Sequence, residues 1–84
     1  MEGRWEEAVE INRAILTQAP RDVEARNRLG KALMELGRFQ EAMDAYRASL
    51  DIDPGNVIAR RNIERLEDIG DAAPQVTSTP GLRP

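Results

Sequence analysis

An internal repeat with a period of 34 residues is the feature of this chain that most restricts its fold. Residues 3–20 align without a gap on residues 37–54, and eight of the eighteen aligned positions are identical. Both copies carry apolar residues at helical spacing. A period of this length built only from helical patterns predicts stacked pairs of antiparallel helices. Such arrays usually bind other chains and carry out no chemistry.

Composition and charge agree with one small helical domain. The chain has 84 residues, of which 40% are hydrophobic and 32% are charged. No apolar run approaches the ~18 residues that a membrane span needs, and the acidic start differs from the basic start of a signal peptide. We therefore expect a cytoplasmic protein with no membrane partner. The net charge of −3 argues against non-specific binding of nucleic acid.

Hydrophobic periodicity and turn residues predict four helices, over residues 3–18, 22–36, 38–52 and 56–69. Asp22 and Asn56 hold equivalent places before the second and fourth helices, where their side chains suit N-caps. Gly37 and Gly70 are predicted to end the same two helices. Residues 71–84 contain three prolines and few apolar side chains, which predicts a disordered tail or flexible linker.

Small and apolar residues recur at defined spacing in the middle of the chain. They are Leu29, Gly30, Ala42, Tyr46 and Pro54. This pattern resembles the tetratricopeptide repeat family, although Arg26 and Leu33 stand where the family has Trp and Tyr. The resemblance implies an all-α fold, a short right-handed α-solenoid of antiparallel helix pairs. In such a fold Gly30 and Ala42 would let the paired helices cross closely.

The resemblance also divides the chain into parts. Residues 1–70 would form the repeat domain, made of a half repeat, a full repeat over 23–56 and a capping helix over 57–70. Glu64 and Glu67 occupy the places that Gly30 and Leu33 hold in the full repeat. Because burying an unpaired carboxylate is costly, we expect no further helix to pack there.

The first helix resembles the second helix of a repeat, whose usual partner would precede it. Trp5, Ile11 and Ile15 are therefore predicted to lie partly uncovered. Three explanations remain open: the chain is a fragment of a longer array, a second copy covers this face, or the open end is tolerated. The second explanation makes self-association, with a possible homodimer, the alternative function.

The family resemblance implies that the second and fourth helices line a concave groove. The predicted peptide-binding residues on these helices are Asn27, Lys31, Met34, Arg61 and Arg65. Three of them are cationic in a chain that is acidic overall, which favours an extended acidic peptide or a C-terminal carboxylate as the ligand. The competing interpretation is that these are ordinary solvated charges, partly balanced by Glu24, Glu64 and Asp68.

The sequence has few residues suited to catalysis or metal binding. The chain has no His and no Cys, so the commonest general base, the thiol nucleophile and the usual zinc ligands are absent. There is no glycine-rich phosphate loop, and Ser49 is expected to be a small packing residue. We predict a non-enzymatic protein-binding scaffold with no cofactor, no metal and no small-molecule substrate.

Overall fold

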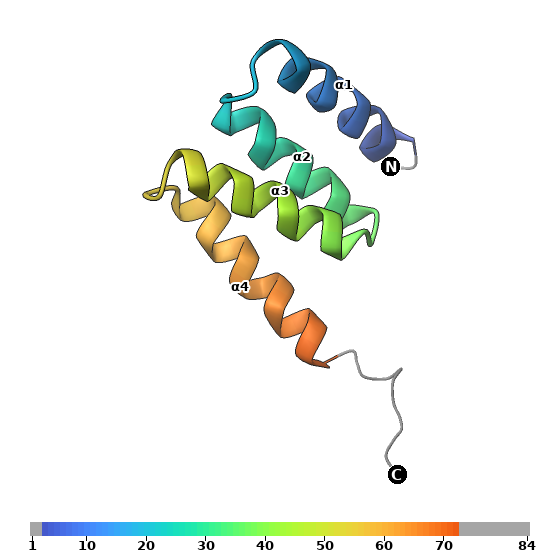
Figure 1. Ribbon diagram of the computed structural model, residues 1–84. Helices are drawn as coiled ribbons and strands as arrows, with labels where there is room; N and C mark the ends of the chain where they lie inside the picture. Colours follow the sequence, from blue (N-terminus) through green and yellow to red (C-terminus); the bar gives the residue numbers. More distant parts are fainter. Residues whose placement is uncertain (1–2, 73–84) are drawn as a thin grey trace.

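The computed structural model describes residues 3–72, which form four α-helices joined by short loops (Figure 1). Their bounds are α1 Arg4–Gln18, α2 Val23–Glu35, α3 Phe39–Ile52 and α4 Val57–Ala72. The predicted all-α repeat fold is confirmed, and the first three helices agree with the predicted bounds to within one residue. Residues 73–84, most of the predicted tail, lie outside the described residues. None of the four helices is both long and apolar enough to cross a membrane.

Each helix packs mainly against its neighbours in the chain, so that α1 to α4 lie side by side in sequence order (Figure 1). Short loops make consecutive helices antiparallel. The core between them consists of Val9, Leu29, Ala32, Leu33, Ala42, Ala45, Tyr46, Ala59 and Leu66. Many of these side chains are alanines, and small residues let helix axes approach closely.

Two helices approach each other closely where Gly30 of α2 meets Tyr46 of α3. A Cβ atom on Gly30 would lie 2.7 Å from Cε2 and Cζ of the Tyr46 ring. Tyr46 is only 1% exposed, so the ring has little room to withdraw. The predicted role of Gly30 at the helix crossing is confirmed.

The predicted helix ends agree with the local hydrogen bonds, with one exception. Asp22 accepts a hydrogen bond from the Ala25 amide at 3.0 Å, and Asn56 accepts one from the Ala59 amide at 3.1 Å. Both are therefore N-caps. Gly37 adopts a φ of 79°, the left-handed conformation expected after α2.

The exception is Gly70, because the prediction that it ends the fourth helix is wrong. Helix α4 continues through Gly70 to Ala72, which also places the first two residues of the predicted tail in a helix. A glycine stops a helix when it turns to positive φ, and among the described residues only Gly3 and Gly37 do so. Gly70 keeps the helical conformation, which costs a glycine at most about 1 kcal/mol relative to alanine.

Two arginines link the loops to the helices that follow them through side-chain hydrogen bonds. Arg26 donates a hydrogen bond from Nε to the Pro20 carbonyl at 3.0 Å, and Arg60 donates one from Nη2 to the Pro54 carbonyl. The two pairs are related by the 34-residue period. Arg26 is the residue that departs from the expected Trp, and the structure gives it a polar role in holding the turn.

Candidate functional site

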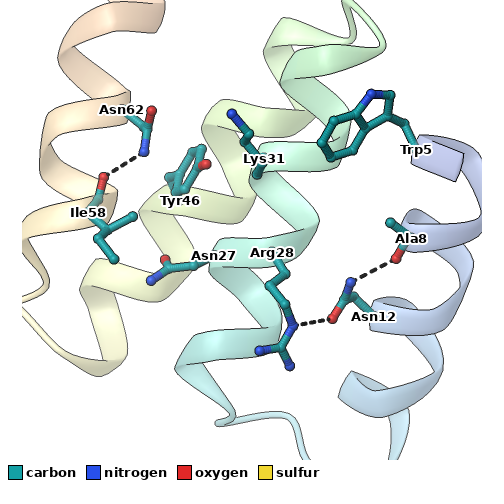
Figure 2. A pocket seen from close by; sticks show the side chains of 9 residues that line it. All are labelled: Trp5, Ala8, Asn12, Asn27, Arg28, Lys31, Tyr46, Ile58 and Asn62. Atoms are coloured by element: carbon teal, nitrogen blue, oxygen red, sulfur yellow. Dashed lines mark hydrogen bonds between the residues drawn. The ribbon is translucent and has the colours of Figure 1, made fainter. Parts of the chain in front are cut away.

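A hollow of about 380 Å³ opens on one side of the molecule between α1, α2 and α4, with Tyr46 contributed by α3 (Figure 2). The residues that line it are Trp5, Ala8, Asn12, Asn27, Arg28, Lys31, Tyr46, Ile58 and Asn62. All four helices therefore contribute to one surface. Its volume is within the range of ~300–1,000 Å³ typical of ligand sites.

The structure brings together only some of the predicted groove residues. Asn27 and Lys31 line the hollow. Met34 is half-buried and packs against the core. Arg61 and Arg65 are exposed on α4 and lie outside the lining, although Arg65 is near enough to Tyr46 to lower its pKa electrostatically.

The side chain of Asn27 belongs to a hydrogen-bond network that joins three helices. Its Oδ1 accepts hydrogen bonds from Ser49 Oγ at 2.8 Å and from Asn56 Nδ2 at 3.2 Å. Ser49 is fully buried, so the expected small packing residue also supplies a hydroxyl to this network. Asn27 is therefore held by the protein itself, and its amide has little capacity left for a ligand.

A buried amide, that of Asn12, supports the opposite wall of the hollow. Asn12 is 4% exposed; its Nδ2 donates to the Ala8 carbonyl at 2.8 Å, and its Oδ1 accepts from Arg28 Nε at 3.1 Å. These bonds hold the Arg28 side chain against α1 (Figure 2). Sequence reasoning missed both residues as part of the site, and an asparagine on the apolar face of a helix was the available signal.

Two cationic side chains at the hollow form exposed ion pairs along α2. Lys31 Nζ lies 3.1 Å from Glu35 Oε2, and Arg28 Nη1 lies 3.6 Å from Glu24 Oε1. Exposed pairs of this spacing contribute only about 0.3–0.5 kcal/mol each. Both cations can therefore exchange their partners for a ligand carboxylate at little cost.

Tyr46 contributes a buried phenol to the hollow. Burial raises its pKa to about 12, an effect to which Glu35 adds and which Arg65 opposes. Within residues 3–72 its hydroxyl has no hydrogen-bond partner. A buried hydroxyl without a partner is unusual in a folded protein.

The titration of Tyr46 can be followed directly because it is the only tyrosine in the chain. We expect phenolate absorbance to appear with a midpoint near pH 12 in the folded protein, and near the ordinary value of 10.0 in denaturant. Since folding favours the neutral phenol, this contribution to stability is complete below pH 10 and is lost as the pH rises toward 12. A midpoint near 10 without denaturant would contradict the burial of the phenol. The Tyr46→Phe variant, which has no phenol, gives the background absorbance.

The residues predicted for self-association lie on two sides of α1. Trp5 is half-buried and lines the hollow. Ile11 is 59% exposed and Ile15 is half-buried, and neither lines the hollow. Six residues of α-helix leave Ile11 roughly 120° around the axis from Trp5. Trp5 therefore belongs with the hollow, and the two isoleucines lie outside it.

The described part of the chain, residues 3–72, contains no group of three His, Cys, Asp or Glu side chains placed to hold a metal ion. The lining of the hollow includes no carboxylate. The hollow is therefore an apolar surface with cations and amides at its borders.

Comparison with known proteins agrees with this architecture. A family model described as tetratricopeptide repeat matches residues 2–57. Small glutamine-rich tetratricopeptide repeat-containing protein 2 of Mycosarcoma maydis is 31% identical over 61 residues, which are 73% of this chain and 17% of that protein. The chain therefore spans less than a fifth of the length of this curated relative. No solved structure gives a significant match.

Proposed function

This chain belongs to the tetratricopeptide repeat family, a family of protein-protein interaction modules, and we propose that its hollow binds an extended acidic peptide. The bound segment is part of a partner protein, either internal or at its C-terminus. The observation that carries this proposal is the pair of cations, Arg28 and Lys31, at the border of an open hollow. The module has no catalytic role of its own in this proposal.

Charge placement supports an acidic ligand. Arg61 and Arg65 add two cations on α4, and neither forms an ion pair within residues 3–72. An acidic segment lying across α2 and α4 would meet Lys31 and Arg65 and compete with Glu24 and Glu35 for the cations of α2. Complementary charge of this kind speeds association and selects the partner.

Self-association through α1 is the second candidate, and the exposure of Ile11 favours it. Its support is weaker than the sequence suggested, because Trp5 lies in the hollow and not beside Ile11. An acidic peptide and a second copy would therefore use different surfaces.

Reversing two groove charges tests the proposal. We expect Lys31→Glu with Arg65→Glu to weaken binding of a fluorescein-labelled Asp/Glu heptapeptide at least tenfold, which corresponds to about 1.4 kcal/mol. Fluorescence anisotropy measures the affinity, which should also fall as salt is added.

The control is Arg21→Glu with Arg47→Glu, two exposed positions that neither line the hollow, as Lys31 does, nor act on the pKa of Tyr46, as Arg65 does. Each reversal changes the charge by 2, so both double variants go from −3 to −7. Equal weakening in the two variants would show that only net charge matters and would refute the groove assignment.

A further inference from the structure

The walls of the hollow are mostly apolar, which an acidic ligand alone does not explain. Trp5 and Ala8 come from α1, Ile58 from α4, and the ring of Tyr46 lies between them (Figure 2). The two asparagines most firmly held here, Asn12 and Asn27, already make hydrogen bonds within the protein. A carboxylate placed inside would lose water and find few donors, whereas an apolar side chain would be buried favourably.

Ile58 is an exposed apolar side chain at this site. It is 58% exposed, although it lies in the first turns of a helix whose other inward residues are well packed. Its neighbour Val57 is 61% exposed but does not line the hollow. Exposed apolar surface that borders a hollow is typical of an interaction site.

The Tyr46 hydroxyl gives an independent indication of a ligand. Tyr46 is 1% exposed, lines the hollow, and has a hydroxyl without a partner among residues 3–72. A hydrogen-bond acceptor from outside the protein would satisfy this buried donor. Lys31 lines the same hollow (Figure 2), so an acceptor that reaches the Tyr46 hydroxyl would share the hollow with a cation.

We propose that the hollow is an anchor pocket for one large apolar side chain of the partner, flanked in the peptide by acidic residues. This inference rests on the proposed function and specifies its ligand. The apolar side chain occupies the space between Trp5, Ala8 and Ile58. A neighbouring peptide carbonyl accepts from the Tyr46 hydroxyl, and the flanking carboxylates pair with Lys31 and Arg28.

Two synthetic heptapeptides test this inference with the full 84-residue chain. Both consist of Asp and Glu, and the central residue is leucine in one and glycine in the other. Calorimetry gives each affinity. The only tryptophan, Trp5, reports occupation of the hollow through the wavelength of its fluorescence. We expect the leucine peptide to bind at least tenfold more tightly and to shift the emission of Trp5 to shorter wavelength.

A matched pair of variants tests whether the leucine side chain binds in the hollow. Ile58→Ser should reduce the preference for leucine to less than twofold, whereas Val57→Ser should retain it, because these neighbours are similarly exposed and only Ile58 lines the hollow. Tyr46→Phe should retain the fold and the preference while weakening both peptides severalfold.

The outcomes separate the two proposals. If both peptides bind equally and their affinity falls with salt, the proposal that the hollow binds an acidic peptide is supported and the anchor pocket is wrong. A leucine preference that survives Ile58→Ser also overturns the anchor pocket, because the side chain would then bind elsewhere. If neither peptide binds at millimolar concentration, both proposals fail.

Discussion

Replacing Gly30 with valine is expected to lower the free energy of unfolding by about 2 kcal/mol, the usual cost of forcing extra atoms into a packed interior. A Cβ at this position would meet the Tyr46 ring at 2.7 Å, well inside normal contact distance. The buried ring cannot swing into solvent, so α2 and α3 must separate to admit the side chain. Urea unfolding followed by circular dichroism measures the loss.

Two alanine substitutions provide the controls for this prediction. Gly30→Ala gains up to about 1 kcal/mol of helix propensity, which offsets part of the clash, and should fall between the wild type and the valine variant. Gly70→Ala adds a Cβ that has no heavy atom within 4 Å, so it should stabilise α4 by about 0.5 kcal/mol. Wild-type stability in Gly30→Val would mean that the helix crossing is not closely packed.

Removing the Asn56 side chain is expected to cost about 3 kcal/mol, because Asn56→Ala deletes a helix cap and also breaks a buried network. Its Oδ1 caps the Ala59 amide, and its Nδ2 donates to Asn27 and, at 3.3 Å, to Ser49. Ser49 is fully buried, so water cannot easily replace the lost partner. Thermal and urea unfolding should both show the loss.

Asp22 is the matched control, since it caps α2 at the position 34 residues earlier. Asp22 accepts from the Ala25 amide, and no hydrogen bond joins its side chain to another helix among residues 3–72. Asp22→Ala should therefore cost only about 1 kcal/mol, the value of a cap alone. Equal losses at the two positions would show that the network around Asn56 adds no stability.

The helices and most of their ends could be predicted because each depends on residues close together in sequence. Asp22 and Asn56 cap helices with their own side chains, and Gly37 turns the chain with its own backbone. Gly70 shows the limit of such reasoning. A glycine permits a helix to end but does not require it, and the backbone beyond Gly70 remains helical to Ala72.

The site was harder to predict because it depends on how separate helices meet. Spacing along α2 groups Asn27 with Lys31, and both residues line the hollow. Spacing could not show that Asn27 is held by Ser49 and Asn56. Trp5 lines the same hollow because α1 packs against α2. The residue pattern of a single helix does not show how two helices pack.

The order in which the helices pack also bears on how the chain folds. Because each helix packs mainly against the helices next to it in sequence, most native contacts close only short loops. Chains with such local contacts have a low contact order and cross a small entropic barrier. Among the four ion pairs within residues 3–72, the pair of Arg13 and Glu41 joins the residues furthest apart in sequence, 28 positions, at 3.0 Å. Folding can therefore begin at any pair of adjacent helices and extend to the neighbouring helices.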